Sequence, residues 1–264
     1  MEPLHGATAF EDSMLSLFEC PVCSDSVLPP VVQCSNGHVV CSICRETVDT
    51  CPLCREQFGC IRNLTLEKIA EKVKFPCKFK SAGCTLTLLA ADKLWHQSVC
   101  LFRSIKCPHP GGECEWQGTA DEIKQHLVSS HPFVMTCEGQ EMMLCGQAYG
   151  AEDAIFYWMQ LQLCFGREFL LVLRRRPIDD ERWRYCAVVQ MIDPDDNAAN
   201  GFAYHLEFHG LDGQHAREGM PLGIEDNVNV ALDNSDCLEF DISNDQIELC
   251  GGVVRIKSTI EDLS

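Results

Sequence analysis

The sequence lacks long apolar runs and is poor in basic residues. Its longest purely apolar stretches are about five residues, such as Phe169–Leu173, whereas a transmembrane helix needs about 20. Lys and Arg number 21 against 39 Asp and Glu, so the formal net charge is −18. A strongly acidic chain repels phosphate backbones. We therefore expect no membrane span and no nucleic-acid partner.

The acidic charge is concentrated in the second half. Residues 1–131 hold 12 basic and 15 acidic residues (−3), and residues 132–264 hold 9 and 24 (−15). Residues 1–19 contain no Lys, no Arg and no apolar run, so they do not resemble a secretory signal. We expect a cytoplasmic protein, with the nucleus as a second compartment, and therefore reduced thiols.

Cysteine, in contrast, is abundant, at 19 residues. Four ligand pairs with one His in the fourth position come first: Cys20 and Cys23, Cys34 and His38, Cys41 and Cys44, Cys51 and Cys54. This pattern predicts two interleaved tetrahedral zinc sites, in which pairs one and three share one ion and pairs two and four the other. Four protein ligands leave no open position, so both ions are expected to be structural. A segment of about 40 residues buries too little apolar surface to fold without them.

An internal repeat follows. Cys77, Cys84, His96 and Cys100 are matched by Cys107, Cys114, His126 and His131, with the first three ligands recurring at an offset of 30 residues. Each repeat predicts a hairpin that gives two Cys and a short helix that gives the last two ligands. Asp92 and Asp121 are the expected N-caps. His109 is excluded as a ligand because Phe79 occupies its place in the first repeat. The chain should therefore bind four zinc ions.

Beyond residue 132 the pattern changes to strands. Met159, Leu161 and Leu163 alternate with Gln160 and Gln162, and turn signals recur between similar segments. Seven or so short strands predict an antiparallel β-sandwich. The fold class is thus a small zinc-stabilised α+β unit and two zinc fingers, followed by an all-β sandwich.

Five segments result. The predicted boundaries are 1–17 for a disordered N-terminus, 18–60 for the first zinc unit, 61–76 for a helical linker, 77–131 for tandem zinc fingers and 132–264 for the sandwich. The linker helix is expected over 65–74, capped by Thr65, with one apolar face.

Several other side chains carry expectations. Trp95 and Trp116 should pack the finger cores. Arg174–Arg176, followed by acidic residues, should form an exposed hairpin. Cys60 has no nearby His in the sequence, so it is expected to be a small packing residue rather than a covalent nucleophile.

A family resemblance adds to these inferences. It is carried by Phe18–Cys23, Leu28–Cys34, Gly37–Cys41, Cys51–Arg55 and Ile61–Leu64, and later by Cys164–Gly166, Val188–Met191, Phe202–Tyr204 and Asn234–Leu238. These segments resemble the seven-in-absentia (Siah) family of RING-type ubiquitin ligases over nearly the whole chain from about residue 18. The first unit then corresponds to a RING finger and the last to a TRAF-like domain.

The resemblance implies a function and its residues. A RING ligase binds a ubiquitin-charged conjugating enzyme (E2) and forms no covalent intermediate with ubiquitin. By similarity, Val22, Val48 and Pro52 form an apolar shelf for the E2, and Arg55 bridges E2 and ubiquitin. Ubiquitinated substrates are degraded by the proteasome.

The family's TRAF-like domain forms homodimers and receives protein substrates as extended peptides. By similarity, the substrate groove lies near Met135, Cys137 and Gln160, and Gln160 stands where Met is usual. The alternative function is a non-catalytic TRAF-like zinc-binding scaffold, in which the RING is only structural.

Overall fold

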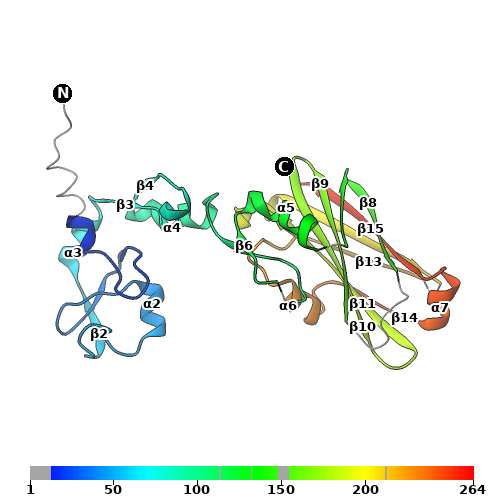
Figure 1. Ribbon diagram of the computed structural model, residues 1–264, viewed down its shortest axis with the longest axis horizontal. Helices are drawn as coiled ribbons and strands as arrows, with labels where there is room; N and C mark the ends of the chain where they lie inside the picture. Colours follow the sequence, from blue (N-terminus) through cyan, green and yellow to red (C-terminus); the bar gives the residue numbers. More distant parts are fainter. Residues whose placement is uncertain (1–12, 113, 132, 148–154, 212) are drawn as a thin grey trace. The chain divides into compact units, whose positions relative to one another are not determined.

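The computed structural model describes residues 13–112, 114–131, 133–147, 155–211 and 213–264 (Figure 1). The chain divides into two compact units, Met1–Phe102 and Arg103–Ser264, so the two repeats fall in different units. In the described part of the chain, no helix has both the length and the apolar character that a membrane span requires.

The first zinc unit is a small fold built around its own ligands. Strands β1 (Val32–Cys34) and β2 (Phe58–Arg62) pair antiparallel, and helix α2 (Ser42–Thr47) lies between them in the chain. Five cysteines belong to its buried cluster, together with four apolar residues: Cys20, Cys34, Cys41, Cys44, Cys51, Val27, Val31, Val40 and Phe58. More than half of this core therefore consists of candidate ligands, so its apolar burial is small.

The linker helix is present but shorter than predicted. Helix α3 runs over Leu64–Ala70, and Asn63 rather than Thr65 is its N-cap. The Asn63 side chain accepts a hydrogen bond from the Leu66 amide at 2.9 Å. Asparagine is among the best N-cap residues, and the prediction of Thr65 placed the cap two residues too late.

The apolar face of this helix is buried as expected. It packs with Phe18 and Phe75, whose rings meet edge to face at 5.1 Å. Residues 13–16 form a short helical turn, and Leu15 of this turn also packs against the cluster. The expected disorder of residues 1–17 is therefore wrong at this end, and residues 1–12 lie outside the described part.

The first finger follows in the same unit. It comprises β3 (Lys74–Pro76), the 3-10 helix η1 (Lys80–Ala82), β4 (Thr87–Leu89) and α4 (Ala90–Val99). Leu89 rather than Asp92 stands at the N-cap. Lys93 of α4 is fully buried and pairs with Asp25 of the RING. A buried ammonium needs such a partner, so this ion pair ties the finger to the RING.

The second finger opens the second unit. Strands β5 (Ile105–Lys106) and β6 (Gln117–Gly118) pair antiparallel, and α5 (Ala120–Ser130) follows. Thr119 and Glu122 form a capping box at the start of α5, so the predicted cap at Asp121 is wrong.

Two sheets form the sandwich. One has the strand order β14-β11-β10-β9-β7 and the other β13-β12-β15-β8. The strands of the first sheet are β7 (Val134–Glu138), β9 (Phe156–Cys164), β10 (Arg167–Pro177), β11 (Arg182–Ile192) and β14 (Leu238–Ser243). Those of the second are β8 (Glu141–Gln147), β12 (Phe202–Gly210), β13 (Gly213–Gly219) and β15 (Val253–Asp262). All these pairings are antiparallel except that of β7 with β9.

Short helices connect the later strands. These are η2 (Asp196–Gly201), α6 (Val228–Asp233) and α7 (Asn244–Leu249). Helix α6 lies close to β11 in Figure 1, where it covers part of the five-stranded sheet.

The five-stranded sheet is buried on both faces. One face packs against the other sheet, with residues such as Leu171 and Phe240 between them. The opposite face is covered by Ile123 and Leu127 of α5, together with residues of α6. The second zinc finger is thus part of the sandwich's hydrophobic core.

Because α5 and α6 cover the outer face of this sheet, the alternation of apolar and polar residues along β9 does not separate a buried face from an exposed one. Met159 and Leu161 pack in the finger-side cluster, whereas Gln160 and Gln162 are buried on the opposite side of the strand. Gln162 donates hydrogen bonds to the carbonyl oxygens of Gly139 and Gln140 at 2.8 and 2.9 Å. Both strand faces are therefore interior, which a half-polar pattern does not indicate.

The prediction that the basic run Arg174–Arg176 is exposed is wrong for two of its three residues. Arg174 is only 4% exposed and donates to Asp233 at 2.6 Å. The guanidinium of Arg175 lies over the Trp183 ring, 4.2 Å from its centroid. Long-range partners therefore bury two of the three arginines.

We predict that the second unit needs its finger for solubility. A fragment of residues 103–264 should be monodisperse. A fragment of residues 132–264 loses the side chains of Ile105, Ile123 and Leu127, which leaves an apolar sheet face in water. Size-exclusion chromatography with a hydrophobic dye should show aggregation and dye binding for the shorter fragment alone. Equal behaviour of the two fragments would contradict this packing.

Candidate metal centres and partner surfaces

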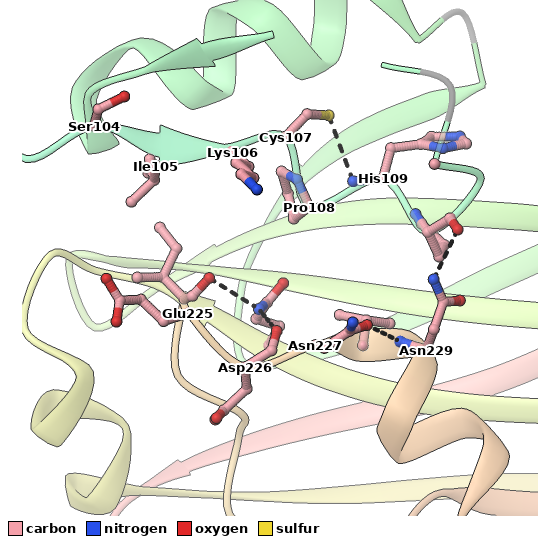
Figure 2. Close-up of a pocket in the computed structure, with 15 residues that line it drawn as sticks. Ser104, Ile105, Lys106, Cys107, Pro108, His109, Glu225, Asp226, Asn227 and Asn229 are labelled. Carbon is pink, nitrogen blue, oxygen red and sulfur yellow. Dashed lines mark hydrogen bonds between the residues drawn. The ribbon is translucent and has the colours of Figure 1, made fainter. Parts of the chain in front are cut away.

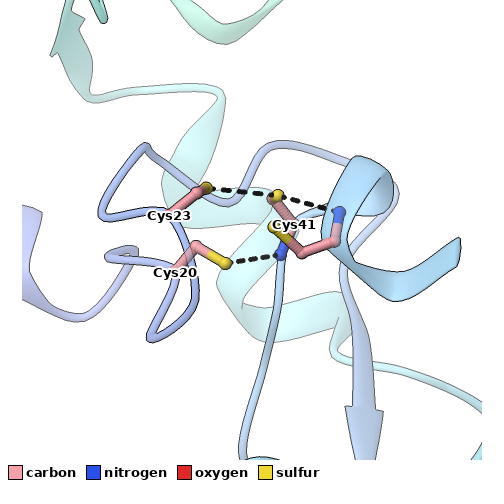
Figure 3. A group of neighbouring side chains, drawn as sticks. Cys20, Cys23 and Cys41 are labelled. Atoms are coloured by element: carbon pink, nitrogen blue, oxygen red, sulfur yellow. Dashed lines mark hydrogen bonds between the residues drawn. The ribbon is translucent and has the colours of Figure 1, made fainter. Parts of the chain in front are cut away.

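The first metal centre of the RING combines ligand pairs one and three. The sulfurs of Cys23 and Cys41 lie 3.7 Å apart, and the Cys41 amide donates to the Cys20 sulfur at 3.4 Å (Figure 3). Cys44 completes the set. Burial acts to raise the pKa of the Cys20 thiol, but amide donors such as Cys41 N outweigh it and lower that pKa to about 7.

The second centre combines pairs two and four. Nδ1 of His38 lies 3.6 Å from the Cys34 sulfur, 3.3 Å from that of Cys54 and 3.7 Å from that of Cys51. The sulfurs of Cys34 and Cys54 are 3.7 Å apart. The structure thus places the eight residues in the cross-braced arrangement that their order predicts.

These distances fit zinc. Zn–S bonds of about 2.3 Å and Zn–N bonds of about 2.0–2.1 Å in a tetrahedron imply S–S edges of about 3.8 Å and S–N edges of about 3.6 Å. The measured edges are 3.7 Å between sulfurs and 3.3–3.7 Å between sulfur and nitrogen. The donors are therefore spaced as one ion in each centre requires.

The two fingers repeat this geometry. In the first, the sulfurs of Cys77 and Cys100 are 3.8 Å apart, and Cys84 Sγ lies 3.4 Å from His96 Nε2. All four predicted ligands of that finger form one group. The last of them, Cys100, is the C-cap residue of α4.

The second finger uses two histidines. His131 Nε2 lies 3.3 Å from the Cys107 sulfur and 3.3 Å from His126 Nε2, and Cys114 completes the group. Burial lowers the pKa of His131 to about 4, with smaller contributions from the charges of nearby His109 and His126. The imidazole is thus neutral at neutral pH, as a metal ligand must be.

Aromatic rings stack directly on both histidine ligands of the second finger, whereas in the first finger Phe79 packs against the cysteine cluster. His109 stacks on His131 with 4.4 Å between ring centroids, and it is not one of the grouped donors. Trp116 stacks on His126 at 4.2 Å. In the first finger Trp95 is exposed, so the expectation that it packs the finger core is wrong.

Apolar side chains protrude between the RING ligands. The residue before the second Cys of three ligand pairs is exposed: Val22 (46%), Ile43 (68%) and Leu53 (60%). Of the predicted shelf, Pro52 is exposed as well, whereas Val48 is half-buried against the RING core. Ile43 and Leu53 are not among the predicted shelf residues, although their shared position before the second Cys of a CxxC pair is visible in the sequence.

Arg55 follows the last RING ligand and is exposed. Its φ is +65°, and its amide donates to the Cys51 carbonyl at 2.8 Å. That turn holds Arg55 next to the second centre, with its side chain available to a partner. Cys60, in β2, is also exposed, so the expectation of a packing role is wrong.

The three predicted groove residues differ in their access to solvent. Met135 of β7 is 49% exposed, Cys137 is half-buried and Gln160 is buried. Gln160 Nε2 donates to the Cys137 sulfur at 3.0 Å, and Gln160 Oε1 has no hydrogen-bond partner. Strand β7 is an edge strand of its sheet, so Met135 is the residue of this set that a bound peptide can reach.

A cavity of about 490 Å³ lies elsewhere in the second unit. Figure 2 shows Lys106 and Pro108 of the finger on one side of it and Asp226 on the other. Gln190 fixes the loop wall by donating to the carbonyl oxygens of Gly223 at 2.8 Å and Asp226 at 3.1 Å. The finger–sandwich packing, which the sequence did not reveal, creates this cavity.

The four centres and the two-sheet domain define a class of protein: a RING with two zinc fingers and a TRAF-like domain. Three family models match the chain. They are described as "E3 ubiquitin-protein ligase sina/sinah, RING finger" at residues 20–54, "Sina, zinc finger" at 68–144 and "Sina, TRAF-like domain" at 162–259.

Curated relatives cover most of the chain. It is 41% identical over 255 residues to the Drosophila melanogaster protein "E3 ubiquitin-protein ligase sina", which is 97% of this chain and 81% of the relative. It is 39% identical over 248 residues to the human "E3 ubiquitin-protein ligase SIAH2", which is 94% of this chain and 76% of the relative. The chain belongs to the seven-in-absentia (Sina/Siah) family, which confirms the resemblance and the predicted fold class.

We predict that His131, and not His109, holds metal. His131→Ala should lower the zinc content of the full-length protein by one ion, because it removes one of the four donors. His109→Ala removes a stacked ring of the same type and should keep the content unchanged. Native mass spectrometry checks both. If His109→Ala lost one zinc ion and His131→Ala lost none, His109 would be the ligand in place of His131.

We also predict that Gln160→Met stabilises the sandwich by about 1 kcal/mol, because it removes a buried acceptor that has no partner. Gln162→Met is the matched control. It should destabilise by about 1–3 kcal/mol, because it removes the donor to the Gly139 carbonyl and one of the two donors to the Gln140 carbonyl, which keeps the Ile260 amide. Urea unfolding midpoints of the two variants should therefore shift in opposite directions.

Proposed function

We propose that the protein is a RING-type E3 ubiquitin-protein ligase that recruits a ubiquitin-charged E2 through its RING and protein substrates through its sandwich. The observation that carries this proposal is the pair of cross-braced donor sets with exposed apolar side chains between the ligands. Its product is a ubiquitinated substrate marked for proteasomal degradation.

The RING contributes position rather than reacting groups. Both of its donor sets supply four protein ligands, so the bound zinc ions hold the fold and leave no open coordination position. The thioester belongs to the E2, and a substrate lysine attacks it directly. Restricting the mobile ubiquitin to a near-attack geometry can lower the barrier by several kcal/mol.

The docking surface follows from which side chains are exposed. Val22, Ile43 and Leu53 offer apolar area, and each is adjacent to a metal ligand in the sequence. Their positions are therefore fixed by the coordination geometry. Arg55 provides a planar cation beside this surface that can donate to carbonyl oxygens of the E2 and ubiquitin together.

Substrates bind as extended peptides along β7. Support comes from its place at the edge of the five-stranded sheet, where main-chain donors and acceptors can pair with an added strand. The exposed Met135 offers an apolar contact for alternate side chains of the peptide. Peptide mapping against the 103–264 fragment, with β7 substitutions, tests this mode.

The functional form is a homodimer joined through the sandwich domain, located in the cytoplasm with the nucleus as a second compartment. The edge strands of the two sheets support dimerisation, since pairing between copies would satisfy their unpaired backbone groups. Light scattering on the full-length protein should give twice the 29.6 kDa chain mass. Fractionation of cells tests the compartment.

We predict that Arg55→Ala lowers autoubiquitination at least tenfold while the zinc content stays unchanged. Lys72→Ala removes one positive charge from the same unit outside the RING and should keep full activity. Chain formation with a panel of E2 enzymes measures both. A wild-type protein that forms no ubiquitin chains with any of them is a non-catalytic scaffold, and this outcome would refute the proposal.

A further inference from the structure

A fifth group of metal-ligating side chains lies in the sandwich, away from the four predicted centres. Cys186, Cys237 and Glu239 place their sulfur and carboxylate atoms within 4.8 Å of one another. The sheet register explains this: Cys186 of β11 stands opposite Glu239 of β14. Cys237 lies in the bend directly before β14, and its sulfur belongs to the same group of donor atoms.

The two thiols are interior and the carboxylate reaches solvent. Cys186 and Cys237 are buried, whereas the Glu239 side chain is 28% exposed. Cys186 Sγ lies 3.9 Å from Glu239 Oε2, and the exposed Ser235 hydroxyl lies 3.3 Å from the same oxygen. The Glu239 side therefore gives an ion a way into the cluster.

Two arginines lie beside the cluster, and each already has its own acid. Arg174 Nη2 is 3.9 Å from the Cys186 sulfur, but this guanidinium pairs with Asp233 at 2.6 Å and donates to the Leu232 carbonyl at 2.7 Å. Arg184 contacts Glu239 at 3.2 Å and pairs with both oxygens of Asp241 at 2.8 and 3.0 Å.

The charge count is compatible with a bound cation. A divalent ion displaces the protons of both thiols when it binds, so two thiolates, one carboxylate and the ion sum to −1. The two Arg–Asp pairs add no net charge. The guanidinium near Cys186 would act as an N–H donor to a ligated sulfur, the outer-shell contact that orients metal ligands.

We propose that Cys186, Cys237 and Glu239 form a fifth metal site, which binds Zn²⁺ through two thiolates and one carboxylate. This ligand chemistry suits zinc. Tetrahedral S–S and S–O edges are about 3.8 and 3.6 Å, and the donor atoms lie within 4.8 Å of one another, so they need to move together by no more than about 1.2 Å. Three protein ligands leave one position open, which distinguishes this site from the four closed centres.

The test counts metal in the full-length protein. The wild type, Cys186→Ala and Cys164→Ala are saturated with zinc, desalted and measured by native mass spectrometry. Cys164 is the matched control, because it is also a buried cysteine of the sandwich but belongs to no donor group among the described residues. Relative to the number of zinc ions counted in the wild type, we expect one ion fewer in Cys186→Ala and the same number in Cys164→Ala.

Glu239→Gln provides a second readout that does not disturb the interior. We expect the chelator concentration that releases one zinc ion to fall at least tenfold, while release of the other ions is unchanged. If Cys186→Ala does not fold, zinc release from Glu239→Gln tests the proposal instead. Equal zinc counts in the wild type and the folded Cys186→Ala protein, or unaltered release from Glu239→Gln, would overturn the proposal. A Cys186–Cys237 disulfide in the wild type, seen as a mass lower by two hydrogens, would overturn it as well.

Discussion

Metal coordination is the constraint on which the first unit depends. Its RING core contains five candidate ligands and only four apolar residues, so burial alone cannot offset the conformational entropy of its loops. Interleaving makes the two centres interdependent, because the segment from Cys34 to Cys44 carries ligands for both. Loss of either ion therefore releases loops that also position the other.

Metal coordination also stabilises the sandwich, because the second finger supplies part of its hydrophobic core. Helix α5 carries the ligand His126 on the same element as Ile123 and Leu127, which are fully buried against the five-stranded sheet. The coordination bond fixes the helix that covers this sheet. Metal binding in the finger and hydrophobic packing of the sandwich are therefore one cooperative event, although the sequence suggests two separate domains.

The sequence predicted those parts of the structure that depend on local spacing. Ligand sets follow from intervals within about 30 residues, and the repeat reinforces them. The burial of Gln160 and Arg174 could not be predicted, because their partners come from distant strands and loops. The helix caps failed for a local reason, since Asn63 and Thr119 compete successfully with neighbouring Thr65 and Asp121. Cys186 and Cys237 are 51 residues apart in the sequence, and only the pairing of β11 with β14 and the bend before β14 bring them together.

The RING surface shows how a structural ion can serve catalysis without touching the reaction. Val22, Ile43 and Leu53 each precede a ligand directly, so their Cα positions are set by the metal to within one peptide unit. An apolar contact of this kind has little conformational freedom to lose when a partner protein binds. A hydrophobic core of similar size would permit more motion, because dispersion contacts are weak and non-directional. Zinc thus supplies directionality as well as stability to this surface.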